Sequence, residues 1–493
     1  MTRVITVCAA ALATLLVSAA ATSAAVPLTR VSADPFTNAT SQHATELEPD
    51  TFAHHGTMVA TFQVGRFFNG GATDIGAVRS GDGGTTWDAP TFLPGQTFSA
   101  NPPFGDPASP YERTSDATVA YDARHGVWMI SSIPIRPDTV VPTVFISRST
   151  DDGRSWGRPI SMPPPASRKV NLDKNWTVCD NHTDSPFYGH CYTELDNFAE
   201  GDLELMSTST DGGLTWSTPI PTAGRDKGLG GQPVVQPTGT VIVPFESISG
   251  KIAAFQSTNG GASWTKAASV ASIRFHGVAG DLRTSPLPSA EIAADGTVFV
   301  AWEDCRFRKR CASNDIVFSR SSNGVDWTAP ARVPIDAVTS GADHFIPGLG
   351  VDPTTSGDSA HLALTYYFYP DATCTGGCRL QAGYTSSPNA GATWGAPTEL
   401  TGAMSLSDIA QTSQGPMVGD YISTSISGGT ASTVIAVGLP HAAGSPFDEA
   451  MYAPTSKLPI ATAAQATRPS STAGASEVTG QGIGETHLAL KHD

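Results

Sequence analysis

The chain has 493 residues, of which 15% are charged and 8% aromatic, and it contains 49 glycines and 37 prolines. These glycines and prolines argue against long helices, because both residues interrupt them. The formal net charge of -16 argues against nucleic-acid binding, which needs a basic surface to neutralise phosphates. An anionic ligand would require a local cluster of arginine or lysine side chains working against this field.

Residues 1–25 are typical of an export signal. Arg3 gives a positive start, residues 4–17 are apolar, and residues 18–25 are small. This order indicates a secretory signal peptide cleaved near Ala24 or Ala25. No later run of about 18 apolar residues follows, so we expect no membrane span. The sequence therefore predicts a secreted, extracellular protein, and we expect a monomer.

Cysteine usage agrees with export. Cys8 belongs to the signal peptide, and the other six form three close pairs: Cys179 with Cys191, Cys305 with Cys311, and Cys374 with Cys378. An even count in an exported chain predicts three local disulfides. The spacings come without matching histidines, which argues against zinc. We therefore expect no metal and no cofactor.

A short pattern recurs along the chain, with serine first, Asp or Asn third, glycine fifth and tryptophan last. Its clearest copy is Ser209-Thr-Asp211-Gly-Gly213-Leu-Thr-Trp216; others begin at Ser80, Ser149, Ser257 and Ser387, and a copy one residue shorter begins at Ser321. The Asp or Asn side chain can accept hydrogen bonds from its own turn, glycine supplies positive φ, and tryptophan packs beneath. An alternating strand precedes each copy, so the pattern predicts a structural hairpin turn.

Two further strands precede each such hairpin, for example 117–121 with 127–131, so one unit has four strands. After the last copy, residues 418–424, 433–437 and 450–452 predict three strands without the pattern. A strand near 28–32 could supply the fourth and close a ring, which gives seven units. Residues 456–493 are rich in Ala, Thr, Ser and Gly and predict a disordered tail. The folded domain is therefore expected over residues 26–455.

The recurring pattern resembles the Asp-box, and residues 45–455 are similar to sialidase-type (BNR-repeat) β-propellers. The resemblance implies an all-β Asp-box propeller with six four-stranded blades, whereas the count of units favours seven. The box is more specific for blades than for activity. In such a propeller, the loops between second and third strands and those between blades share the face opposite the boxes. We expect function on that face, where the repeat is least regular.

Charged residues are dense on the expected face. The segment Trp302-Glu303-Asp304-Cys305-Arg306-Phe307-Arg308 lies in a loop closed by the Cys305–Cys311 pair, which indicates a preorganised site. The starts of the first strands should lie at the mouth of the central channel: Asp116, Asp173 with Lys174, Gln232, Asp343 with His344, and Asp420 with Tyr421. An acidic ligand is expected to meet these arginines and carboxylates there.

The resemblance implies a secreted sialidase-like glycoside hydrolase that removes terminal sialic acid, or a related acidic sugar, from a glycan or sialoglycoconjugate. Such enzymes use a tyrosine nucleophile activated by a glutamate, an aspartate acid/base, and three arginines that bind the carboxylate. In this chain the catalytic candidates are Tyr421, Glu303, and Asp116 or Asp173. The substrate-binding candidates are Arg113, Arg283 and Arg306, together with Asp343.

The early arginine motif of secreted sialidases, F/Y-R-I-P, has no match before the first box, where the chain reads Gly65-Arg66-Phe67-Phe68. The catalytic assignments therefore rest on position in the repeat. The alternative is a non-catalytic propeller that binds a glycan, a peptide or a cell-wall polymer on the same face. Three arginines converging beside a Tyr–Glu pair would favour the enzyme, and arginines scattered round the rim would favour binding.

Overall fold

The computed structural model describes residues 26–466. Over these residues the chain is all-β, with antiparallel strands and five 3-10 helices of three residues each. The described part contains no helix of the length and apolarity that a membrane crossing needs. The expected signal peptide lies outside the described residues.

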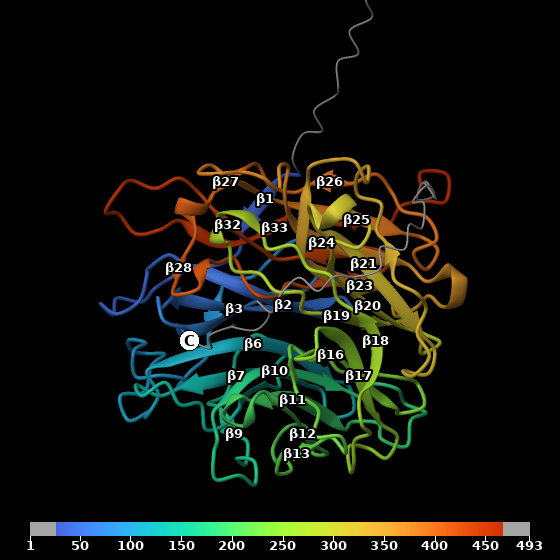
Figure 1. Ribbon diagram of the computed structural model, residues 1–493. Helices are drawn as coiled ribbons and strands as arrows, with labels where there is room; N and C mark the ends of the chain where they lie inside the picture. Colours follow the sequence, from blue (N-terminus) through green and yellow to red (C-terminus); the bar gives the residue numbers. More distant parts are fainter. Residues whose placement is uncertain (1–25, 467–493) are drawn as a thin grey trace, which may run out of the picture.

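The first three groups of strands follow one another along the chain (Figure 1). Set 1 comprises β2 (Glu46–His54), β3 (Thr57–Arg66), β4 (Ala72–Ser80) and β5 (Thr91–Phe92). Set 2 comprises β6 (Arg113–Asp122), β7 (Val127–Ile135), β8 (Phe145–Ser149) and β9 (Ile160–Ser161). Set 3 comprises β10 (Leu172–Cys179), β11 (Cys191–Asn197), β12 (Leu203–Ser209) and β13 (Ile220–Pro221). Within each set, consecutive strands pair antiparallel.

The next three groups repeat this order. Set 4 comprises β14 (Gly228–Leu229), β15 (Val234–Val235), β16 (Val241–Ser247), β17 (Lys251–Ser257) and β18 (Ala268–Ser272). Set 5 comprises β19 (Ser289–Ile292), β20 (Val298–Asp304), β21 (Asp315–Ser321) and β22 (Ala331–Arg332). Set 6 comprises β23 (Asp343–Val351), β24 (Leu362–Tyr369), β25 (Arg379–Ser387), β26 (Thr398–Glu399) and β27 (Met404–Ser405). The hairpin β28 (Gln411–Thr412) and β29 (Gly415–Pro416) leads to the last set.

The last set joins the two ends of the described chain. It comprises β30 (Thr424–Ser427), β31 (Thr430–Thr433), β32 (Ile435–Gly438), β33 (Glu449–Pro454), β34 (Leu458–Pro459) and the N-terminal β1 (Leu28–Arg30). Strand β1 pairs with β33, with Leu28 opposite Pro454, and in Figure 1 this blue strand lies among orange and red ones. The predicted pairing of the N-terminal strand with the last set is therefore confirmed.

The first strands of the sets contact one another in a cyclic order; in set 4 the first strand is divided into β14 and β15, which both pair with β16. Strand β2 contacts β6, β6 contacts β10, β10 contacts β15, and β15 contacts β19; β19 then contacts β23, β23 contacts β30, and β30 returns to β2. The apolar core lies between neighbouring sets, as where Val59 and Ile75 of set 1 pack with Val119 and Trp128 of set 2. Because each set buries its faces against its neighbours, the starts of the first strands gather around one axis.

The repeated turns lie between the third and fourth strands of sets 1 to 6, as predicted. In the first, Asp82 Oδ1 accepts hydrogen bonds from the amides of Thr85 (3.0 Å) and Thr86 (2.9 Å) and from the Ser80 hydroxyl (2.8 Å). These donors outweigh the effect of burial and lower the pKa of Asp82 to about 2. At Gly84, where φ is +94°, an added Cβ would clash with Ser432 of the last set. The box turn thus also fixes the packing between sets.

The predicted disulfides are confirmed in their pairing: Cys179–Cys191, Cys305–Cys311 and Cys374–Cys378. The expected disordered tail does not begin at Ser456, because β34 pairs with β31 and Leu458 is buried there. Strand β34 has two residues, of which only Leu458 is buried, and one buried apolar residue is too weak a signal to predict a strand. The rest of that tail, 467–493, lies outside the described residues.

Candidate functional site

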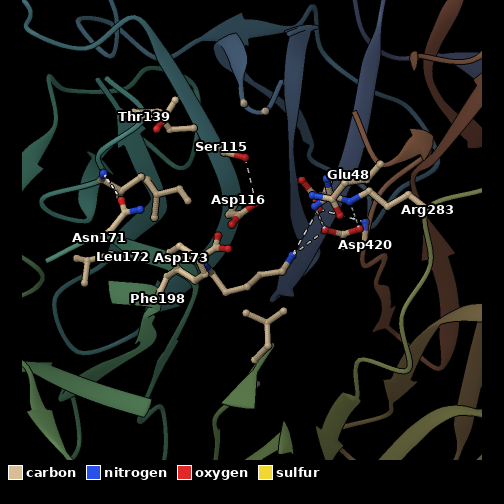
Figure 2. A pocket seen from close by; sticks show the side chains of 18 of the residues that line it. Glu48, Ser115, Asp116, Thr139, Asn171, Leu172, Asp173, Phe198, Arg283 and Asp420 are labelled. Atoms are coloured by element: carbon tan, nitrogen blue, oxygen red, sulfur yellow. Dashed lines mark hydrogen bonds and ion pairs between the residues drawn. The ribbon is translucent and has the colours of Figure 1, made fainter. Parts of the chain in front are cut away.

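A narrow polar cavity opens where the first strands of several sets begin. Its walls come from the loops between second and third strands and the connections between sets, which is the face expected from the repeat. Its charged lining residues are Glu48, Arg66, Asp116, Asp173, Lys174, Arg283 and Asp420. Figure 2 shows Asp116 and Asp173 on one side of this cavity and Glu48, Arg283 and Asp420 on the other.

Three of these side chains are placed by β-bulges in first strands. The strand register shifts at Glu48, Asp116 and Lys174, and their φ values are +60°, +51° and +37°. A bulge leaves extra residues unpaired and redirects their side chains. Positive φ in residues other than glycine is strained and gathers at functional sites. The shared distortion therefore turns charged side chains of sets 1, 2 and 3 toward one cavity.

Lys174 links the two sides of the cavity. Its Nζ lies 3.5 Å from Glu48 Oε1 and 3.8 Å from Asp420 Oδ2, and the lysine is 5% exposed. Burial would lower the pKa of Lys174, but Asp116, Glu48 and Asp420 outweigh it and raise the pKa. The lysine is therefore a fixed positive charge in the cavity.

Asp420 is held as a carboxylate by Arg283. The guanidinium donates from Nε to Oδ1 at 2.9 Å and from Nη2 to Oδ2 at 2.7 Å, a bidentate geometry that is strong and directional. Burial alone would raise the pKa of Asp420. The opposing effect of Arg283 and Lys174 is larger, so the net shift of the pKa is downward. The Asp420 amide in turn donates to Glu48 Oε1 at 3.1 Å, which ties set 1 to the last set.

Asp116 has the opposite electrostatic character. It is 6% exposed, and burial raises its pKa to about 7, with Glu48 and Asp173 adding to the rise and Lys174 opposing it. The Ser115 hydroxyl donates to its Oδ1 at 3.1 Å. A carboxyl group that titrates near neutrality can give and take a proton during a reaction.

The charges of the cavity nearly balance. Four carboxyl groups and three cations line it, and once Asp116 carries a proton the two signs are equal. An anion entering the cavity then escapes the repulsion expected from a protein of net charge -16. Arg66, Lys174 and Arg283 supply the positive charges of the cavity.

Tyr421 lies against this cluster, with its hydroxyl engaged elsewhere. The hydroxyl donates to the backbone carbonyl of Ala117 at 3.2 Å, and the ring centroid is 4.2 Å from Lys174 Nζ. Burial, together with Glu48 and Asp116, raises the pKa of Tyr421 well above its usual value. In this arrangement the phenol holds its proton firmly.

Glu303 and Asp343 lie together in another part of the molecule. Glu303 Oε2 accepts from the Ile346 amide at 3.0 Å, and Asp343 Oδ1 accepts from the Asn314 amide at 2.6 Å. Burial, opposed by the Ile346 amide and reinforced by Asp343, raises the pKa of Glu303 well above its usual value. Neither residue belongs to the described lining of the cavity, and the carboxylates that act on Tyr421 are Glu48, Asp116, Asp50 and Asp420.

The three expected arginines have three different environments, and only Arg283 lines the cavity. Arg113 is 1% exposed and donates to the carbonyls of Asn69 (3.0 Å) and Gly70 (2.8 Å), so it holds the turn that forms one wall. Arg306 pairs with Asp304, its Nη2 lying 2.7 Å from Oδ2, in the disulfide-closed loop. The structure therefore does not assemble these three guanidinium groups.

Glu48 and Arg66 are cavity residues that sequence reasoning missed. Arg66 ends β3 and its Nη1 donates to Gln63 Oε1 at 3.0 Å, while the Gln63 amide donates to Glu48 Oε2. The sequence around Arg66 departs from the F/Y-R-I-P motif, so that motif does not point to it. Its position before the first repeated turn was the signal that could have found it.

A row of carboxyl groups extends from the cavity into set 3. Asp173 of β10 lies opposite Asp196 of β11, which lies opposite Glu204 of β12. Asp196 and Glu204 are fully buried, and burial together with neighbouring carboxylates raises both pKa values well above the usual range. Burial and the neighbouring carboxylates therefore disfavour the charged form of both groups.

One described group of side chains has the spacing of a metal site, namely Asp315, Asp336 and His344. Arg308 Nη2 lies 2.6 Å from both Asp315 Oδ1 and Asp336 Oδ1, and Arg332 Nη2 lies 2.8 Å from Asp315 Oδ1. Two guanidinium groups thus neutralise the two carboxylates. The group is an ion-pair network and offers little attraction to a cation.

Comparisons with known proteins return only distant similarity. No family model and no curated protein match the sequence. Similar solved structures include a Dyadobacter fermentans protein of unknown function, with 15% identity, 73% of this chain and 99% of that chain covered, and a TM-score of 0.46. The NanB sialidase of Streptococcus pneumoniae has 12% identity, with 88% of this chain and 71% of that chain covered, and a TM-score of 0.41. An ulvan lyase of a polysaccharide lyase family has 11% identity, with 86% of this chain and 95% of that chain covered, and a TM-score of 0.45. At this distance the likenesses do not assign an activity.

Proposed function

We propose that the chain is a seven-bladed Asp-box β-propeller and an exported hydrolase of glycans that carry an acidic sugar. The cyclic contacts of the first strands, from β2 through β30 and back to β2, support the blade number. The observation that carries the function is Asp116, whose pKa is raised to about 7, in a cavity that also holds Arg66, Lys174 and Arg283.

The proposed reaction cleaves a glycosidic bond with two carboxyl groups. Protonated Asp116 donates its proton to the glycosidic oxygen, so the leaving sugar departs with a hydroxyl group. Asp173, which is partly exposed in the same cavity, accepts a proton from the attacking water, whose oxygen joins the anomeric carbon. Arg66, Lys174 and Arg283 bind the carboxylate of the acidic sugar through charge-assisted hydrogen bonds.

Release of terminal sialic acid is the specific reaction that we propose first, because a sialic acid presents a carboxylate at the reacting carbon. A Tyr421 nucleophile would first have to leave the Ala117 carbonyl. Its proton would then pass to Glu48, which lies near the phenol, because Asp116 already carries the proton for the leaving group. We therefore assign proton transfer to Asp116 and Asp173.

The test is release of 4-methylumbelliferone from glycosides of N-acetylneuraminic acid, glucuronic acid and galactose. We expect turnover of an acidic glycoside and none of the galactoside. Asp116→Asn should lower kcat by about 100-fold or more, the usual contribution of a positioned acid. Asp184→Asn, an exposed aspartate in the β10–β11 turn, is the matched control and should keep full activity.

Binding without catalysis is the second candidate. It is favoured by the ion pairs that fix Lys174 and Arg283 in position. Cations held in position can bind an acid without any proton transfer. Calorimetry with N-acetylneuraminic acid separates the two functions. Saturable binding with no turnover on any of the glycosides would support the binding protein and overturn the hydrolase.

A further inference from the structure

We infer that the ligand of this site is an oligosaccharide, and that Tyr111 forms an outer subsite for a sugar next to the acidic one. This inference rests on the proposed function and names its substrate class. The outer subsite is a shallow groove lined by Pro110, Tyr111, Arg136, Pro137, Asp138 and Pro142.

One loop contributes lining residues to both the groove and the acidic cavity. The connection between β7 and β8 contributes Thr139 and Val141 to the lining of the cavity, and it contributes Arg136, Asp138 and Pro142 to the groove. Neighbouring residues of one chain lie about 3.8 Å apart. A ligand that leaves the cavity over Thr139 therefore reaches the groove with its next unit.

The chemistry of the groove suits a sugar. Three proline rings and the Tyr111 ring supply an apolar surface, and Tyr111 is fixed by edge-to-face contact with Phe145 at 5.1 Å between ring centroids. Arg136 and Asp138 form an exposed ion pair of 3.1 Å at its rim and offer both hydrogen-bond donors and acceptors. A pyranose has an apolar C–H face and polar hydroxyl edges, and a rigid tyrosine beside charged groups binds such amphipathic surfaces well.

Exposed aromatic residues gather on the same face. Among the described residues the exposed phenylalanines are Phe68, Phe98 and Phe198, at 57%, 41% and 41%. Phe68 lies in the β3–β4 loop, Phe98 lies between sets 1 and 2, and Phe198 lines the cavity itself. The Phe98 amide donates to the Tyr111 carbonyl at 2.9 Å. Platforms of this kind around the cavity fit a chain of sugars better than one terminal residue.

The test is calorimetry of N-acetylneuraminic acid methyl glycoside and of 3'-sialyllactose, both in S-linked forms that resist hydrolysis, on wild type and on Tyr111 variants. We expect 3'-sialyllactose to bind about tenfold more tightly than the monosaccharide. Tyr111→Ala should remove that gain, since truncating a central aromatic contact costs about tenfold, and should leave the monosaccharide affinity unchanged. Tyr111→Phe keeps the ring and should keep the gain.

The control variant is Tyr188→Ala. Tyr188 lies in the β10–β11 turn, and its neighbour Phe187 packs against Gly260 of a repeated turn, which places Tyr188 on the face that carries the repeated turns. It should bind both ligands as wild type does. Equal affinity of wild type for the two ligands, or an oligosaccharide affinity unchanged in Tyr111→Ala, overturns the outer subsite and leaves the proposed function standing. Failure of both ligands to bind the wild type overturns the proposed function and this inference together.

Discussion

Replacing Asp211 by alanine measures what one box turn contributes to stability. Asp211 Oδ1 accepts from the amides of Leu214 (3.0 Å) and Thr215 (2.9 Å), and Oδ2 accepts from the Thr215 hydroxyl at 2.6 Å. Water can reach this exposed turn, so we expect a loss of about 1–2 kcal/mol, the lower part of the range for unsatisfied groups. With an unfolding entropy of about 2.1 cal/mol/K per residue, the described domain should melt about 1–2 °C lower.

Differential scanning calorimetry checks this expectation beside activity and ligand affinity. Asp326→Ala is the matched control, because Asp326 belongs to another box turn and its carboxylate accepts from Asn323 Nδ2 at 3.0 Å on the exposed surface. The control should melt within experimental error of wild type. A variant of Asp211 with unchanged melting temperature and lost function would refute the structural reading and place the box turns at the site.

Three further outcomes are expected. Lys174→Met should destabilise the protein by about 3–5 kcal/mol, because it leaves buried carboxylates unpaired; because Lys174 lowers the pKa of Asp116, the alkaline limb of the pH–rate profile should also move to higher pH. Arg306→Ala should leave ligand affinity unchanged in calorimetry, since Arg306 pairs with Asp304 outside the cavity; weaker binding would return the clamp to the disulfide loop. The melting temperature should fall from pH 5 to pH 8.5, because burial raises the folded pKa values of Glu194 and Glu291 to about 8. The folded state therefore binds protons more tightly than the unfolded state across that range. A rising melting temperature would contradict this, and Glu194→Gln should flatten the trend.

The fold could be predicted from the sequence because the same turn pattern and its flanking strands recur along the chain. Each box pattern fixes a turn between third and fourth strands, so the units could be counted without knowing their contacts. The strand at Leu28 was expected from the missing fourth strand of the last unit, and it pairs with β33. Local spacing likewise sufficed for the disulfides, whose partners are at most 12 residues apart.

The site was harder to predict because its residues meet over long sequence separations. Lys174 Nζ reaches Glu48, 126 residues earlier, and Arg283 reaches Asp420, 137 residues later. The bulge at Glu48 reverses which side chain faces the axis, and no composition signal marks it. Glu303 was favoured because charged residues surround it, yet strand alternation in β20 turns it into a buried position beside Ile346.

The pH dependence of kcat/KM on an acidic fluorogenic glycoside shows whether Asp116 transfers the proton. Asp116 must be protonated to act as the acid, so the wild type should lose activity as pH rises through about 7. Asp116→Asn should retain affinity for the substrate by calorimetry, lose most turnover, and show no such alkaline limb. An Asp116→Asn variant with wild-type turnover and an unchanged alkaline limb would show that Asp116 is not the acid.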